Sequence, residues 1–143
     1  AQLLEEREHV FHSFESMIGE GVQPDLVAFL SLLSVCNHVG LVEKGCTYFG
    51  SIYKDEYDVM PMLEHFTCVV GILGRAGNIE EVVSMIQNMP FHPSTVSWHT
   101  LLGACQSLCN SKLAEYAFEN SLVLNESDCT AYVSLSNIYT KCL

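Results

Sequence analysis

Apolar residues recur along this chain at the spacing of one face of an α-helix. Counting from Phe66, apolar side chains follow three, four and seven positions later, at Val69, Val70 and Leu73. Residues at these intervals lie on one side of a helix, where they can pack against a neighbour. The pattern therefore predicts a helix that begins near residue 62 and closes near Gly77.

A second helix is expected directly after the first. Gly77 can adopt the positive φ of a helix C-cap. Asn78 can cap the following helix, and Glu80 and Glu81 are favourable in its first turn. Pro90 cannot continue a helix, so the second helix should stop before it. The predicted unit is a hairpin of two helices.

The same frame of positions recurs, which marks the hairpin as one copy of a repeat. Each copy has an aromatic anchor in its first helix, and the anchors are Phe29, Phe66, Trp98 and Tyr132. They lie 37, 32 and 34 residues apart, so the period is near 35 residues. Eleven positions after the first three anchors stand Gly40, Gly77 and Cys109. Twenty positions after them stand Phe49, Ile86 and Phe118, with Phe14 in the same slot one period earlier.

A two-helix unit of about 35 residues cannot bury both of its apolar faces alone, but stacked copies can. The sequence therefore predicts an all-α fold, a right-handed α-solenoid of helix-turn-helix repeats whose first helices line the concave side. Tetratricopeptide repeats have a similar period, but their first helix requires Trp-x-x-Leu-Gly-x-x-Tyr, which this chain lacks. The connector at 55–61 lengthens one repeat, either as a loop of tolerated length or as a family-specific spacer.

Composition agrees with a folded helical array. The chain has 143 residues, of which 49% are hydrophobic and 16% charged, a balance typical of globular rather than disordered proteins. No run approaches the roughly 18 apolar residues of a membrane span, and the first residues do not form a signal-peptide core. Because it starts at Ala1 and ends inside a helical pattern at Leu143, we expect a piece of a longer array.

The formal net charge is −11, with six basic and 17 acidic residues. A module that neutralises phosphates usually presents a basic face, and this sequence does not predict one. The acidic residues fall mainly on second helices and connectors. They form either a solvated outer face or a docking face for a basic partner.

Seven cysteines are spread over the repeats. They form no Cys-x-x-Cys, and no His-x-Glu or His-x-x-x-His accompanies them, so zinc and redox motifs are absent. Cys105 and Cys109, one helical turn apart, are the closest in sequence. We expect reduced thiols that act as small apolar residues, the alternative being a disulfide or metal site formed by some pair.

Five stretches together resemble the C-terminal end of plant pentatricopeptide repeat proteins of the PLS subclass. Three resemble the last long and short repeats, namely Gly-Val-Gln-Pro-Asp (21–25), Phe-Leu-Ser-Leu-Leu-Ser-Val-Cys-Asn-His-Val-Gly-Leu-Val-Glu-Lys-Gly (29–45) and Glu-His-Phe-Thr-Cys-Val-Val-Gly-Ile-Leu-Gly-Arg-Ala-Gly (64–77). Two resemble the E-type motifs that follow, namely Trp-His-Thr-Leu-Leu-Gly-Ala-Cys (98–105) and Tyr-Val-Ser-Leu-Ser-Asn-Ile-Tyr (132–139).

The resemblance implies a division of the chain into family repeats. Residues 1–25 would end a truncated repeat, 26–62 would be a long repeat and 63–94 a short repeat. Residues 95–128 would be an E-type degenerate repeat, and 129–143 would start a second one.

The resemblance also implies a function, which is binding of single-stranded RNA in the mitochondrion or chloroplast. A transit peptide would then lie upstream of this fragment. Such proteins usually select a cytidine for C-to-U editing, with a deaminase domain or other editing cofactor proteins as partners. The alternative is a protein-interaction scaffold without direct RNA contact, which the acidic charge favours.

In this family one repeat meets one base, which two or three side chains recognise. The recognition positions are the residue after the aromatic anchor and the residue that closes the repeat. In this chain they are Leu30 with Met62, Thr67 with Ser94, Asp25 without its partner, and His99 in the E-type unit. Leu30 and Met62 cannot hydrogen-bond a base, whereas Thr67 with Ser94 could donate and accept, and Asp25 could favour a keto base. Thr67 could equally be an ordinary exposed residue of its helix.

No catalytic role is predicted for the chain. The deaminase that often follows such repeats needs a zinc-binding His-x-Glu and Pro-Cys-x-x-Cys, and neither is present. A nucleophile elbow and a Gly-rich phosphate loop are also missing. We therefore expect no enzyme activity, metal, cofactor, small-molecule substrate or membrane contact.

Overall fold

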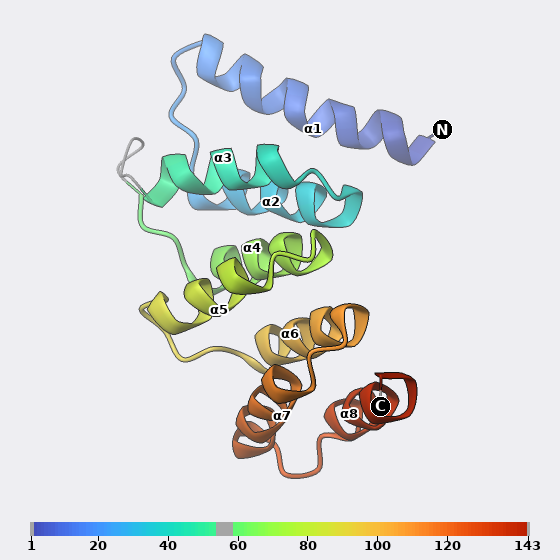
Figure 1. The fold of residues 1–143 in the computed structure, drawn as a ribbon. Helices are drawn as coiled ribbons and strands as arrows, with labels where there is room; N and C mark the ends of the chain where they lie inside the picture. Colours follow the sequence, from blue (N-terminus) through green and yellow to red (C-terminus); the bar gives the residue numbers. More distant parts are fainter. Residues whose placement is uncertain (1, 54–58, 143) are drawn as a thin grey trace. The chain divides into compact units, whose positions relative to one another are not determined.

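A computed structural model describes residues 2–53 and 59–142, with side chains for residues 7–52 and 59–142. These residues form helices and no strand (Figure 1). The helices are α1 (Gln2–Gly19), α2 (Leu26–Val39), α3 (Val42–Tyr53), α4 (Leu63–Arg75), α5 (Ile79–Asn88), α6 (Thr95–Leu108), α7 (Ser111–Leu124) and α8 (Cys129–Cys142). The predicted all-α, helical-repeat fold is confirmed. Most of the expected connector at 55–61 lies outside the described residues.

The chain divides into two units, Ala1–Ile72 and Leu73–Leu143, with the boundary inside α4. In the first unit the helical hairpin of α2 and α3 follows the predicted frame. The anchor Phe29 is fully buried, and so are the three residues that follow at the helical spacing, Leu32, Leu33 and Cys36. Burial raises the pKa of the Cys36 thiol to about 11, so this cysteine is an apolar core residue, as expected.

The turn between α2 and α3 is made by a glycine in the left-handed region. Gly40 has φ 82° and its N–H donates to the carbonyl of Cys36 at 2.9 Å. The next N–H, that of Leu41, donates to the same carbonyl at 3.0 Å. Both bonds go to one carbonyl of the last turn of α2, and α3 begins two residues after Gly40.

Aromatic pairs join successive repeats of the first unit. Phe14 of α1 packs edge-to-face against Phe29, with ring centroids 5.2 Å apart. Phe49 of α3 packs in the same way against Phe66 of α4 at 5.1 Å. The residue twenty positions after one anchor therefore contacts the anchor of the next repeat.

The second unit repeats this packing with α5 to α8. Trp98 is 5% exposed and packs edge-to-face against Tyr116 of α7. Phe118 of α7 contacts the next anchor, Tyr132, with ring centroids 5.0 Å apart. Tyr132 itself is 52% exposed, and the residue four positions after it is the polar Ser136, where the other copies have Leu33, Val70 and Leu102.

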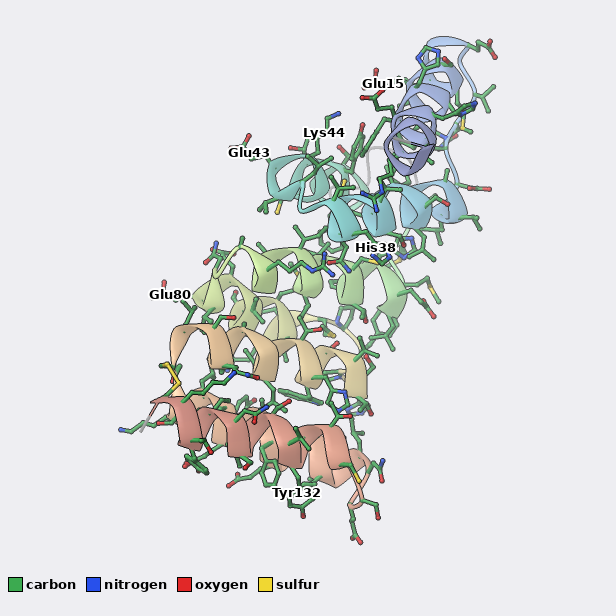
Figure 2. All side chains as sticks on the ribbon, turned by 90° about the vertical axis from the view of Figure 1, so that its right-hand side faces the viewer. Glu15, His38, Glu43, Lys44, Glu80 and Tyr132 are labelled. Atoms are coloured by element: carbon green, nitrogen blue, oxygen red, sulfur yellow. A yellow bond between two sulfur atoms is a disulfide. The ribbon has the colours of Figure 1, made fainter. Side chains whose placement is uncertain are left out.

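Two local expectations are corrected by the second unit. Asn78 precedes α5, but its side chain makes no capping hydrogen bond because its backbone, at φ −89° and ψ 73°, is not in the extended conformation of an N-cap. Cys109 and Cys142 form a disulfide (Figure 2), although all cysteines were expected to be reduced. The bond joins the end of α6 to the end of α8, a proximity that only the packing of these helices creates.

Candidate nucleic-acid interface

The recognition positions lie at the start of each first helix and in its second turn. α2, α4, α6 and α8 begin directly after Asp25, Met62, Ser94 and Asp128. The matching position after each anchor lies one to two turns further along the same helix. The sequence frame therefore sets both members of each pair relative to a helix N-terminus.

Asp25 is an exposed N-cap. Its Oδ1 accepts a hydrogen bond from the N–H of Ala28 at 2.9 Å, as its capping role predicts. An ionised carboxylate accepts at both oxygens, so capping by one oxygen does not use up its capacity to accept from a ligand.

Ser94 is the equivalent N-cap of α6. Its Oγ accepts from the N–H of Ser97 at 3.4 Å, and its side chain is half-buried. A hydroxyl that accepts from the backbone retains its own O–H as a donor. The same hydroxyl also lies 3.4 Å from Oγ of Ser97, and either of the two can be the donor. Ser94 is therefore partly engaged within its own turn, in a more enclosed position than Asp25.

Thr67 is half-buried on α4. Its Oγ1 donates to the carbonyl of Leu63 at 2.9 Å, a bond internal to the helix. The donor is thereby occupied, and the lone pairs of the hydroxyl remain as acceptors. Thr67 belongs to the first unit and Ser94 to the second.

The pair formed by Leu30 and Met62 is apolar. Leu30 is half-buried and Met62 is 47% exposed. Neither side chain carries a group that could recognise the edge of a base through a hydrogen bond. Their contribution is limited to apolar contact.

His65 is a buried polar residue of this turn that the sequence did not suggest. Its ring is 2% exposed, and its Nδ1 accepts from the N–H of Met62 at 3.1 Å. Its Nε2 lies 2.9 Å from the carbonyl of Leu26 and therefore carries the proton. His65 thus reaches back to the N–H of the residue that precedes α4, and its other ring nitrogen ties the first turn of α4 to the first turn of α2.

His99 is brought into contact with a carboxylate. Its Nε2 lies 2.6 Å from Oδ2 of Asp128, a side chain that is only 5% exposed. Ser121 of α7 donates its hydroxyl to the same oxygen, and Oδ1 accepts from the N–H of Ala131 at 3.1 Å. Asp128 therefore joins α6, α7 and the N-terminus of α8.

The surroundings of Asp128 favour its ionised form. Desolvation raises the pKa of this carboxyl. Hydrogen bonds from Ser121, His99 and the N–H of Ala131 together lower it by more than desolvation raises it, so the pKa lies below its usual value. Sequence reasoning did not single out Asp128. The signal was present, since it precedes Tyr132 by four residues as Asp25 precedes Phe29 and Ser94 precedes Trp98.

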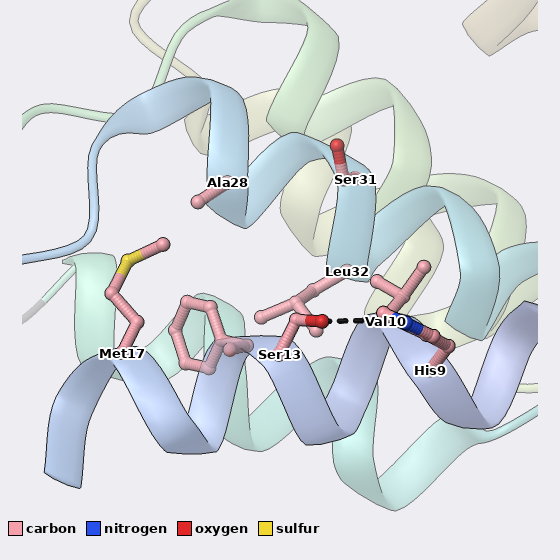
Figure 3. Close-up of a pocket in the computed structure, with 8 residues that line it drawn as sticks. His9, Val10, Ser13, Met17, Ala28, Ser31 and Leu32 are labelled. Carbon is pink, nitrogen blue, oxygen red and sulfur yellow. Dashed lines mark hydrogen bonds between the residues drawn. The ribbon is translucent and has the colours of Figure 1, made fainter.

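A cavity of about 260 Å³ opens between α1 and α2 (Figure 3). Its lining is mainly apolar, with Phe14, Met17 and Leu32 among the residues. Within it, the hydroxyl of Ser13 and Nδ1 of His9 lie 3.0 Å apart, one helical turn from each other. Among the side chains that the structure describes, the lining contains no carboxylate that would orient the histidine as the third member of a nucleophilic triad.

Two other features concern the described part of the chain, a metal site and a membrane span. No group of three or more His, Cys, Asp or Glu side chains is placed to hold a metal ion. No described helix has the length and apolar character needed to cross a membrane.

Comparison with known proteins gives relatives of one kind. No family model matches the chain. A chloroplastic pentatricopeptide repeat-containing protein of Arabidopsis thaliana is 41% identical over 130 residues, which are 91% of this chain and 15% of the relative. A mitochondrial one from the same plant is 40% identical over 126 residues, or 88% of this chain and 20% of the relative. A third pentatricopeptide repeat-containing protein of the same plant is 45% identical over 132 residues, which are 92% of this chain and 18% of the relative.

The chain spans only 15% to 20% of the length of these three relatives. Within that span the identity runs through the repeats that hold the candidate interface. Over about nine tenths of its length, the chain is therefore similar to plant pentatricopeptide repeat-containing proteins.

Proposed function

We propose that this chain is a segment of an organellar pentatricopeptide repeat protein that binds single-stranded RNA. The observation that carries the proposal is that polar side chains occupy the recognition positions, Asp25 and Ser94 as N-caps of α2 and α6, and Thr67 in the second turn of α4. Polar side chains at recognition positions of successive helical repeats can each meet one base of an extended strand. The names of two relatives, one chloroplastic and one mitochondrial, support an organellar location.

The finer assignment is to the C-terminal repeats and E-type motifs of the PLS subclass, acting in C-to-U editing. In this proposal the repeats at 26–62 and 63–94 contribute base contacts, while the following units present a surface to a deaminase or another editing cofactor. The bonds of His99 support this division. Its Nε2 and Oδ2 of Asp128 are engaged with each other, so base recognition by His99 would first have to break its bond to the residue whose other oxygen caps α8.

Binding measurements on the whole protein test the proposal through two substitutions that preserve local structure. Thr67→Val removes the hydroxyl but keeps the β-branched shape. Asp25→Ser removes the carboxylate but keeps an N-cap. Each should weaken binding to the cognate RNA about tenfold, the equivalent of roughly 1.4 kcal/mol for one base contact, and relax the preference for one base.

Thr47→Val provides the matched control. Thr47 Oγ1 donates to the carbonyl of Glu43 at 2.8 Å, just as Thr67 donates to Leu63, but it lies on the second helix α3. Its replacement should leave RNA affinity unchanged. If Thr67→Val and Asp25→Ser behaved like Thr47→Val, this segment would not contact RNA.

That result would favour the second candidate, a scaffold for protein partners. The net charge of −11 and the apolar pair Leu30 and Met62 favour it, because both disfavour contact with phosphate and base edges. The scaffold hypothesis predicts that Thr67→Val and Asp25→Ser leave the affinity for a protein partner unchanged, measured with the purified deaminase or editing cofactor.

A further inference from the structure

The turn after α6 differs from its counterparts in the other repeats. The residue eleven positions after the anchor is a glycine in two repeats, Gly40 with φ 82° and Gly77 with φ 76°. In the third repeat it is Cys109, which holds the same left-handed conformation at φ 55°. It is the only described residue other than glycine with a positive φ.

A cysteine at this position is conformationally unfavourable. The left-handed region places Cβ close to the following carbonyl, so glycine is the less strained choice. A side chain other than glycine at a strained backbone position often has a specific role. At Cys109 that role is the disulfide bond to Cys142.

The disulfide holds the far end of α8. The Cα atoms of Cys109 and Cys142 are 5.4 Å apart, within the normal range for a disulfide, and 33 residues separate them. At its N-terminus α8 is held by the cap of Asp128. Along its length only Ala131 and Ile138 are buried among the described residues of the helix. Near its C-terminus the hydroxyl of Tyr139 also donates to the carboxylate of Glu115 on α7. The disulfide adds a covalent tie at the last turn, beyond these contacts.

The same bond is open to attack from solvent. Cys109 is exposed and Cys142 is half-buried. The other five cysteines are free thiols, and they include the exposed Cys129 at the start of α8. The chain therefore contains an exposed free thiol at one end of α8 and an accessible disulfide at the other. Exposed disulfides are the labile and regulatory ones.

We propose that Cys109 and Cys142 form a reversible thiol–disulfide site that orders the C-terminal turn of α8 when oxidised and releases it when reduced. The co-reactant is a dithiol or disulfide of the glutathione or thioredoxin class. In oxidation, the two thiols lose two electrons and two protons to form the S–S bond, and the disulfide of the co-reactant is reduced to two thiols. Reduction is the reverse exchange, through a mixed disulfide at the more exposed Cys109.

The test equilibrates the 143-residue chain in buffers that span a wide range of reduced to oxidised glutathione. Free thiols are then alkylated, and the peptide that links Cys109 to Cys142 is quantified by mass spectrometry. The linked peptide should appear in oxidised buffers and disappear reversibly in reduced ones. Hydrogen exchange at residues 138–142 should be about tenfold slower in the oxidised form, because closing the loop restricts local opening.

Three variants separate the site from general effects of oxidation. Cys109→Gly restores the residue found in the other repeats and should remove the redox dependence of exchange in α8. Cys142→Ser should do the same and serves if Cys109→Gly alters the turn. Cys129→Ser, an exposed cysteine at the other end of α8, should leave the redox dependence intact.

Two results would overturn the proposal. A linked peptide that persists in strongly reducing glutathione buffer would make the bond a permanent staple. Exchange at residues 138–142 that is the same in oxidised and reduced chain would mean that the bond does not control α8.

Discussion

At the scale of single residues, Asp128 shows how one side chain can join three helices. It caps α8 through the N–H of Ala131, accepts the hydroxyl of Ser121 from α7 and lies 2.6 Å from Nε2 of His99 on α6. In two earlier repeats the same position holds a simple cap, Asp25 or Ser94. A common register therefore gives a solvent-facing group in one repeat and a buried connection in another.

Asp128→Asn is expected to destabilise the chain by about 2 kcal/mol at neutral pH, because a neutral amide forms weaker hydrogen bonds than a carboxylate. The folded-state pKa of Asp128 is lowered, so its carboxylate contributes stability above the unfolded value of about 4. That contribution is lost as the pH falls through the folded pKa. Denaturant unfolding of the original chain and of Asp128→Asn, measured from pH 7 downward, should show that their difference in free energy of unfolding becomes smaller at acidic pH.

Glu126→Gln is the control for Asp128→Asn. Glu126 is an exposed acid in the same connector, and losing its charge should change the free energy of unfolding by less than about 0.5 kcal/mol. If the deficit of Asp128→Asn stayed constant at low pH, the cause would be altered packing and not the loss of an ionised group.

At the scale of elements, the repeats pack by close approach of helices at small residues. Gly45 of α3 is buried, and a Cβ placed there would lie 2.6 Å from Cδ1 of Ile72 and 3.2 Å from Cβ of Cys36. A glycine inside a helix is usually unfavourable by about 1 kcal/mol relative to alanine. At Gly45 the loss is offset because the absent side chain lets α3 approach both α2 and α4.

Gly45→Ala and Gly50→Ala form a matched pair on α3 with opposite expected effects. Gly45→Ala should destabilise the chain by about 1 to 3 kcal/mol through overpacking. A Cβ at Gly50 would meet no atom within 4 Å, so Gly50→Ala should stabilise by up to about 1 kcal/mol. Thermal unfolding of the two variants measures both changes in stability. A higher Tm for Gly45→Ala would show that the Ile72 side chain can move aside at little cost in free energy.

At the scale of the whole molecule, the excess of acidic over basic residues affects both stability and binding. Seventeen acidic and six basic residues give a formal net charge of −11. Like charges on a folded chain repel one another, and the unfolded chain spreads them further apart. The acidic surface therefore works against the folded state and also against contact with phosphate.

Added salt is accordingly expected to stabilise the chain at pH 7. Raising NaCl from about 0.02 to about 0.3 M shortens the Debye length from about 20 to about 6 Å. The free energy of unfolding should rise by about 1 kcal/mol, a shift in Tm of about 3 °C at this length. Repeating the titration near pH 4.7, the isoelectric point of the sequence, supplies the control. The salt effect should be much smaller there, and a fall in Tm with salt at pH 7 would contradict the repulsion argument.

Much of the fold follows from the sequence alone, because its determinants are local. Apolar spacing after Phe29, Phe66 and Trp98 sets one face of each first helix, and the described structure buries all three anchors. Turn residues set the helix ends, as at Gly40 and Gly77 with their positive φ. The candidate recognition positions follow from the same frame, since they are fixed relative to helix N-termini.

Contacts between helices were decided only by the tertiary structure. The bonding of Cys109 to Cys142 and of His99 to Asp128 joins residues 33 and 29 positions apart. Their meeting depends on how α6, α7 and α8 pack, which the period of a single helix does not specify. Phe49 and Phe66 were both marked by the repeat frame, yet their edge-to-face contact appears only once the hairpins stack. Periodicity thus determines which side of a helix is buried, whereas packing determines which side chain it meets.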